Sequence, residues 1–252
     1  MNITWDAKGY TSGFAFVHQY GEGVLDLIDA APGSHVVDLG CGNGALSEKL
    51  LSRGYRVTAI DASAEMLAQA RALHPDIAFV QADATDFTLL EPADAIFSNA
   101  VFHWIDRDRQ PLLAASLARN LRPGGQLVCE FGGYGCAERV HSALERAFAA
   151  RGLNYPRVFY FPTIAQHAPI LEAAGLRVTY AVLFDRPTPQ QGEDGLERWI
   201  RMFVKAPFEG IAPDMQDAII GEAVASLRET LRREDGTWFV DYVRIRIKAV
   251  KV

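Results

Sequence analysis

The stretch that decides the fold is HVVDLGCGNGALSEKL, residues 35–50. An apolar run that ends at Leu39 gives way to three glycines, Gly40, Gly42 and Gly44, and a helical pattern follows them. Glycines at a strand-to-helix turn permit positive φ angles and let a ligand approach the backbone closely. The first turn of the next helix adds unpaired N–H groups and a partial positive charge. The stretch therefore predicts a site for a carboxylate or a phosphate, without deciding between them.

Short apolar runs and helical patterns alternate along the rest of the chain. Strands are predicted at residues 35–39, 55–60, 77–80, 93–98, 126–131, 176–184 and 239–250. Helices are predicted at about residues 44–54, 63–73, 109–121, 137–151, 164–174, 194–206 and 213–232. Such alternation is typical of a parallel sheet covered on both faces, with its ligand at the carboxyl ends of the strands.

We expect one domain over residues 1–252. Residues 1–34 are predicted to form an N-terminal helical cover, and residues 35–131 the half that binds a cofactor. Residues 187–238 carry two helical patterns and are too long for a simple loop. We therefore expect them to form a helical cap insertion near the substrate.

Composition and charge exclude several classes of protein. The 252 residues carry a net charge of −6 and no basic run, so neither nucleic acid nor an anionic membrane is an expected partner. No apolar run approaches the ~18 residues of a membrane span, and the N-terminus does not resemble a signal peptide. The three cysteines lack metal-ligand spacing and give no disulfide framework. We expect a cytoplasmic protein without a metal.

Acidic residues narrow the choice of cofactor. Asp61 follows the glycines by about 20 residues and ends the second strand, where an acid binds ribose hydroxyls in NAD-binding folds. Asp38, two residues before Gly40, would repel a pyrophosphate but can receive an ammonium group. Asp83, after the third strand, suits an exocyclic amine such as that of adenine. A cationic ligand with an amino-acid end and an adenosine end is S-adenosylmethionine, and NAD remains the rival.

Five motifs occur in order across residues 36–125: VVDLGCGNG, Asp61 followed by ASAEML, QADATDF, DAIFSNAVFHWI and LRPGG. With them the sequence resembles the class I S-adenosylmethionine-dependent methyltransferases. The resemblance implies an α/β, Rossmann-like sheet of seven strands, mostly parallel with the last strand antiparallel.

The resemblance also implies which residues hold the cofactor. Asp38 is expected to contact it, and Trp104 to pack against it. The others are distributed over the ligand: Gly40, Cys41 and Gly42 on the methionine part, Asp61 on the ribose, Ala62 and Met66 beside the adenine, Asp83 and Ala84 at its edge, and Asn99 and Ala100 near the sulfonium.

More narrowly, SNAVFHWI, EFGG and LFDRPTPQQGEDGLERWIRMF resemble the trans-aconitate 2-methyltransferase-like group. That group methylates carboxylates of small organic acids. The residue before Trp104 is commonly glutamine in these relatives, whereas this chain has His103. His103 is a candidate general base or hydrogen-bond donor, or an ordinary loop histidine.

Aromatic and basic residues are candidates for the substrate end. Tyr10 and Tyr20 could close over the sulfonium through cation–π attraction, or belong to an ordinary covering helix. Arginines bind carboxylates in bidentate fashion. The candidates are Trp199 and Arg201 in the insertion and Arg244 on the last strand, although the basic face of that strand could instead pair with acids on a covering helix.

These features, with the resemblance, predict methyl transfer to a small molecule, with a carboxylate oxygen of a trans-aconitate-like acid as the expected acceptor. A carboxylate is ionised at neutral pH and needs no base, whereas a phenol, an alcohol or a carbon acceptor does. Methylation of a phenol, a nitrogen or a carbon remains an alternative within the same class. A non-catalytic cofactor-binding module and an NAD-dependent oxidoreductase are the alternatives from other classes.

Overall fold

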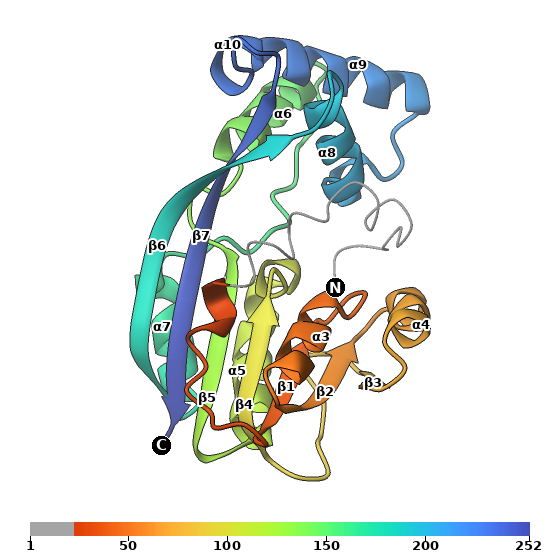
Figure 1. Cartoon of the computed structure of the whole chain (residues 1–252). Coiled ribbons are helices and arrows are strands. Elements are labelled where there is room, and N and C mark those ends of the chain that lie inside the picture. The colour runs from red at the N-terminus through yellow and green to blue at the C-terminus, as the bar shows by residue number, and fades with distance from the viewer. Residues whose placement is uncertain (1–22) are drawn as a thin grey trace.

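The computed structural model describes residues 23–252 of the chain (Figure 1). The strands are β1 (His35–Leu39), β2 (Arg56–Asp61), β3 (Ala78–Gln81), β4 (Ala93–Asn99), β5 (Leu121–Gly132), β6 (Leu176–Gln190) and β7 (Trp238–Lys251). The α-helices are α3 (Ala45–Ser52), α4 (Ala64–Leu73), α5 (Gln110–Asn120), α6 (Glu138–Ala149), α7 (Ile164–Ala173), α8 (Gly195–Phe203), α9 (Pro213–Ser226) and α10 (Arg228–Leu231). Short 3-10 helices are η1 (Phe102–Trp104), η2 (Arg107–Arg109) and η3 (Ala206–Phe208).

The strands form one sheet in the order β3-β2-β1-β4-β5-β7-β6. Strand β7 runs antiparallel to both of its neighbours, and the remaining pairs are parallel. This confirms the predicted seven-stranded, mostly parallel sheet with an antiparallel last strand. Because β1 and β4 are neighbours while their chain connections leave in opposite directions, the sheet has a switch point between them, where ligands bind in this architecture.

Alternating side chains of the central strands make a core on each face of the sheet. In β4, Ala95 and Phe97 pack in one cluster with Leu46 and Leu50 of α3, while Ile96 packs in the other cluster with α5 and α7. This follows from the period of two along a strand. Both faces are therefore covered, as the continuous apolar runs of these strands predict.

Strands β6 and β7 form a long hairpin that rises beyond β5 (Figure 1). The upper half of β7 packs with α6, α8, α9 and α10 around a third apolar cluster above the carboxyl ends of β4 and β5. The helices of the predicted insertion lie within residues 195–231, so its expected boundaries at 187 and 238 fall inside the hairpin. That the insertion caps a substrate site stays a prediction.

Several other predicted boundaries differ. Strand β6 continues to Gln190 instead of ending at residue 184. Strand β5 begins at Leu121 instead of 126, because Leu121 pairs with Ala93 before an irregularity that holds the RPGG segment. The helix predicted at 213–232 divides at Leu227 into α9 and α10.

Of the predicted N-terminal cover, only residues 23–34 are described, and their Val24 and Leu25 are buried against the sheet. Within residues 23–252 no helix has both the length and the apolar character to cross a membrane.

Candidate active site

The glycine turn after β1 is tightly built. Gly40, Gly42 and Gly44 all adopt positive φ angles, of 78°, 56° and 83°. The N–H groups of Gly40 and Cys41 both donate to the carbonyl oxygen of Ile60. A Cβ atom on Gly40 would lie 2.2 Å from Cγ2 of Val101, so this position has no room for a side chain. The turn therefore presents bare backbone to the space beside β4.

Asp61 at the end of β2 is bound to this turn. Its Oδ2 accepts a hydrogen bond from the N–H of Gly42 at 2.9 Å, and its Oδ1 accepts one from the N–H of Ser63 at 2.8 Å. Burial raises the pKa of Asp61, while these backbone donors lower it. The side chain is thereby fixed in direction and retains acceptor positions for ligand hydroxyls.

Asp38 lies beneath the turn and is almost fully buried. Its Oδ2 accepts a hydrogen bond from Oγ of Ser47 at 2.6 Å. Burial raises the pKa of Asp38 to about 7, the Ser47 hydrogen bond lowers it, and the nearby Asp61 raises it further. A carboxylate in such a place gains from a cationic ligand, which would relieve both the desolvation and the repulsion.

Asp83 lies on the opposite side of the same cleft. Its carboxylate accepts hydrogen bonds from Thr85 and from Nη2 of Arg109, the latter at 3.1 Å. Desolvation opposes ionisation of Asp83, but the Thr85 and Arg109 contacts outweigh it, and the pKa lies below its usual value. Asp83 is therefore ionised at neutral pH and remains able to accept from an amine.

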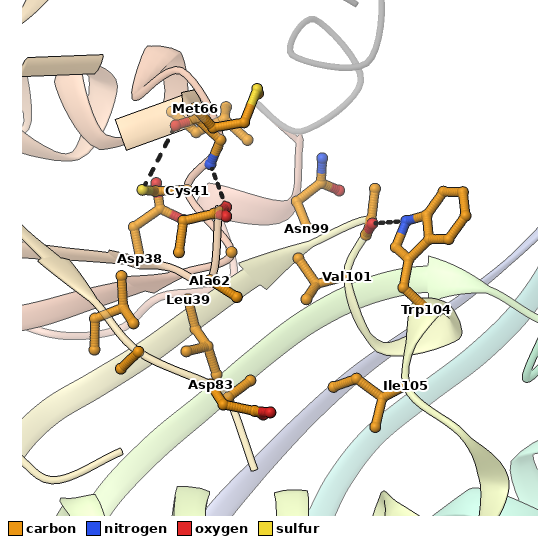
Figure 2. Close-up of a pocket in the computed structure, with 18 of the residues that line it drawn as sticks. Asp38, Leu39, Cys41, Ala62, Met66, Asp83, Asn99, Val101, Trp104 and Ile105 are labelled. Atoms are coloured by element: carbon orange, nitrogen blue, oxygen red, sulfur yellow. Dashed lines mark hydrogen bonds between the residues drawn. The ribbon is translucent and has the colours of Figure 1, made fainter. Parts of the chain in front are cut away.

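One cleft of about 940 Å³, its open mouth included, brings these residues together. Figure 2 shows Asp38, Asp83 and Asn99, from three different strand ends, around it. Every residue expected at the cofactor lines it: Asp38, Gly40, Cys41, Gly42, Asp61, Ala62, Met66, Asp83, Ala84, Asn99, Ala100 and Trp104. Their contacts with a ligand stay predictions.

The chemistry of this cleft fits S-adenosylmethionine. Among the described residues, the lining holds three carboxylates and one basic side chain, Arg109, which is paired with Asp83. Such a lining attracts an ammonium and a sulfonium and would repel a pyrophosphate. Seven further lining residues were not among the predicted cofactor residues: Leu39, Leu46, Ile60, Ala82, Val101, Ile105 and Arg109. Arg109 ends the 3-10 helix η2 and starts a predicted helix, but no motif marks it as a cofactor residue.

Cys41 packs against Ala59 and Leu67 in a small apolar cluster. Burial, with Asp38 and Asp61 nearby, raises the pKa of its thiol far above the usual range. The thiol therefore stays protonated and cannot act as a nucleophile at neutral pH.

A second cavity, of about 530 Å³ with its open mouth included, adjoins the cleft and shares Ala100 and Trp104 with it. We call it the acceptor chamber. Its lining is aromatic for the most part: Ala100, His103, Trp104, Cys136, Ala137, His141, Phe159, Phe161, Trp199, Phe203, Tyr242 and Arg244. Ala100 has an unusual φ of 62°, and its carbonyl oxygen accepts from Nε1 of Trp104 at 3.2 Å (Figure 2). These two residues therefore lie where the two cavities meet.

His103 is buried in the wall of the acceptor chamber. Its Nδ1 accepts a hydrogen bond from the N–H of Gly132 at 3.1 Å, so the neutral ring carries its hydrogen on Nε2. Burial and the nearby Arg244 guanidinium hold the pKa of His103 well below its usual value. His103 is thus a neutral hydrogen-bond donor, and its one lone pair is already engaged.

The basic residues of β7 have different surroundings. Arg246 pairs with the buried Glu130 of β5 at 2.7 Å, and Lys248 pairs with Asp29. Glu130 is also bound by both terminal nitrogens of Arg186. The acids that face this strand thus come from β5 and from the segment before β1, not from a covering helix as the alternative expected. Arg244 has no ionic partner among residues 23–252, and its Nε is buried without an acceptor there.

Of the remaining substrate candidates, one lies in the acceptor chamber, one lies at the surface, and two are outside the described residues. Trp199 lines the acceptor chamber and donates from Nε1 to the hydroxyl of Tyr242 at 2.6 Å. Arg201 lies on the exposed side of α8, where Glu197 and Asp217 bind it, and the structure does not bring it to the chamber. Residues at i and i+4 of a helix are neighbours, and Glu197 and Arg201 have this spacing. Tyr10 and Tyr20 lie outside the described residues.

Comparison with known proteins agrees with this geometry. Residues 36–125 match a family model described as a methyltransferase domain. The chain is 30% identical to an uncharacterised methyltransferase, C70.08c, of Schizosaccharomyces pombe, over 98% of both chains. It is also 30% identical to the trans-aconitate 2-methyltransferase of Azoarcus sp. strain BH72, over 98% of this chain and 99% of that one.

The fold also resembles solved structures. One is the geranyl diphosphate C-methyltransferase of Streptomyces coelicolor A3(2), determined with Mg²⁺, geranyl diphosphate and S-adenosylhomocysteine. It has a TM-score of 0.55 and 18% identity, and the match covers 93% of this chain and 80% of that one. At this identity the likeness concerns the fold alone. The full-length relatives and the family model together give the assignment: the chain belongs to the S-adenosylmethionine-dependent methyltransferases and is an enzyme with their class I fold.

Proposed function

We propose that this enzyme methylates a carboxylate oxygen of a small organic acid. The observation that supports the proposal is Arg244, a buried cation without an ionic partner among the described residues, in the chamber next to the cofactor cleft. A guanidinium binds a carboxylate through two parallel hydrogen bonds. A buried charge without a partner is costly, so a ligand that supplies the missing anion binds favourably.

The cleft would hold the cofactor by its two polar ends. Asp61 would accept from ribose hydroxyls and Asp83 from the adenine amine, while Asp38 and the bare glycine backbone would receive the amino-acid end. When bound, S-adenosylmethionine supplies a methyl group activated by a positively charged sulfur, so transfer to an anionic oxygen needs no proton removal. Ala100 and Trp104 line both cavities and so mark where donor and acceptor would meet.

The titratable groups of the chamber also favour an acceptor that is already anionic. Burial holds the pKa of His103 well below its usual value and lowers that of His141 to about 4. Burial raises the pKa of the Cys136 thiol, and raises that of Tyr242 to about 12. None of these groups is suited to removing a proton at neutral pH, as a phenol or an ammonium acceptor would require.

The chamber therefore contributes mainly by holding the acceptor in place and excluding water. Orientation of two reactants can contribute roughly 7–11 kcal/mol to a transfer reaction. Relatives that share the full length of the chain and are named trans-aconitate 2-methyltransferase lend support, because trans-aconitate is a carboxylic acid.

The test is methyl transfer from labelled S-adenosylmethionine to a panel of small acids, phenols and amines. The proposal expects label in acids, as esters that mild alkali cleaves to release labelled methanol. Label that appears only in phenols or amines, in an alkali-stable form, would move the enzyme to another acceptor class.

A further inference from the structure

The lining of the acceptor chamber restricts which acids can bind there. The inference drawn from it rests on the proposed function, methylation of a carboxylate. We infer that the acceptor is a monocarboxylic acid with an aromatic or similarly flat apolar body, and not a polycarboxylic acid such as trans-aconitate. The charge, the wall and the hydrogen-bonding groups of the chamber each bear on this.

The charge of the chamber matches one carboxylate. Arg244 is the only cationic side chain among the described residues that line it. The neighbouring Arg246 and Arg186 are both committed to Glu130, with N–O distances of 2.6–2.8 Å. A tricarboxylate would bring two further negative charges into this apolar space without partners, which is strongly unfavourable.

The wall of the chamber is built from aromatic rings in mutual contact. Phe159 and Phe161 are stacked, with centroids 5.3 Å apart and planes 7° from parallel. Trp104 meets Phe159 edge-on at 5.1 Å and also contacts Phe203, at 6.3 Å. Trp199 lies 5.5 Å from Phe203. Such a cage binds a flat apolar body through area burial and ring–ring contacts.

Two histidines add neutral donors to the single cation. The hydroxyl of Tyr155 lies 2.6 Å from Nδ1 of His141 and has no other partner among the described residues, so we assign the hydrogen of this bond to Tyr155. His141 then carries its hydrogen on Nε2, which is buried without a partner in the described part of the chain. His103 likewise carries its hydrogen on Nε2, because Gly132 donates to its Nδ1.

His103 lies close to Arg244, and His141 lines the same chamber. Gly132 of β5 pairs with Arg244 of β7 across the sheet, and the same Gly132 donates to His103. The described lining contains no carboxylate. A wall with a guanidinium and two imidazole N–H donors but no acidic side chain suits a group that only accepts hydrogen bonds, and a carboxylate is such a group.

A binding experiment without turnover tests this inference independently of methyl transfer. Titration calorimetry of the full chain with saturating S-adenosylhomocysteine, which prevents turnover, would compare hydrocinnamate, its uncharged amide and trans-aconitate. We expect hydrocinnamate to bind about 10- to 100-fold more tightly than the amide, the range for lost charged hydrogen bonds. Trans-aconitate should bind more weakly than hydrocinnamate. Equal or tighter binding of trans-aconitate would overturn the inference.

The variant Arg244→Met tests the role of the cation. It should bind hydrocinnamate and the amide equally, whereas Arg244→Lys should retain part of the preference for the acid. Arg177→Met, the same change at an exposed position of β6, is the matched control and should behave as the unaltered chain. An unchanged preference in Arg244→Met would overturn the assignment. The wild-type comparison remains decisive if that variant does not fold.

Turnover then distinguishes the two proposals. If trans-aconitate is methylated to an ester with a higher kcat/KM than hydrocinnamate, carboxylate methylation stands and the monocarboxylate inference fails. If no acid is methylated while a phenol or an amine is, the proposed function fails and the inference fails with it.

Discussion

The N–H of Gly42 donates a hydrogen bond to Oδ2 of Asp61 at 2.9 Å, so the turn after β1 and the acid at the end of β2 are held as one unit. A ligand that binds Asp61 therefore meets a loop that is already ordered, and less conformational entropy is lost on binding. The glycine motif and the distant acid act together for this reason.

Asp61→Ala should weaken binding of S-adenosylmethionine by more than about tenfold, because charged hydrogen bonds to the ribose and the tie to Gly42 are lost together. Titration calorimetry measures the dissociation constant. Asp76→Ala, at an exposed loop position, is the control. Unchanged affinity in Asp61→Ala would remove Asp61 from the cofactor site.

Binding of the cofactor should depend on pH through Asp38. Burial raises its folded-state pKa from 3.8 to about 7, so between these values the folded chain holds a proton that the unfolded chain has released. This group's contribution to the stability of the ligand-free fold is therefore lost as the pH rises through that window. A cationic ligand prefers the ionised form, so its affinity should increase as the pH rises from 6 to 8.

Calorimetry at several pH values, on the unaltered chain and on Asp38→Asn, measures this dependence. The variant should bind more weakly at pH 8 and show a flatter profile. A profile that is equally steep in the variant would assign the dependence to another group, such as Asp61, whose pKa burial also raises.

His103→Gln should retain most of the activity toward a carboxylic acid, within about tenfold in kcat. The glutamine carbonyl can replace Nδ1 as acceptor for the N–H of Gly132, and its amide can still donate to the substrate. Steady-state kinetics across pH gives the answer. A loss of about four decades in kcat with unchanged KM would identify His103 as a general base.

Gly40→Ala should both destabilise the fold and impair cofactor binding. Strain at positive φ costs about 1–3 kcal/mol, and the new methyl group would also overlap Val101. Gly210→Ala is a matched control, since Gly210 has the same φ of 78° with nothing near its Cβ position. Thermal unfolding should therefore show a larger loss for Gly40→Ala than for Gly210→Ala. Adding Val101→Ala should recover part of the difference, and no recovery would mean that contact with Val101 is not the cause.

The cofactor half was predictable because its signals are local. The glycine turn, Asp61 and Asp83 each stand at the end of an apolar run, and parallel strands bring their carboxyl ends to one edge. Every residue expected there lines one cleft. The sixth strand was predicted to end at residue 184, yet β6 continues through Pro187 and Pro189. Because β6 is an edge strand, it tolerates prolines that a central strand would not.

The acceptor chamber was only partly predictable. Phe159 and Phe161 come from an irregular segment without periodicity, and only tertiary packing brings them to Trp104. The alternating basic residues of β7 look equivalent in sequence. Their ion pairing differs because Glu130 forms salt bridges with Arg246 and Arg186, whereas Arg244 has no ionic partner among the described residues. Arg201 shows the opposite: it was a substrate candidate, but its salt bridges with Glu197 and Asp217 hold it at the surface.

The central claim is that the methyl group goes to a carboxylate oxygen. The most direct measurement is nuclear magnetic resonance of the product formed from S-adenosylmethionine labelled with ¹³C in its methyl group, with hydrocinnamic acid as acceptor. The account predicts a methyl ester resonance that disappears on mild alkaline hydrolysis as labelled methanol appears. A labelled methyl group found only on nitrogen, carbon or a phenolic oxygen across an acceptor panel would contradict it.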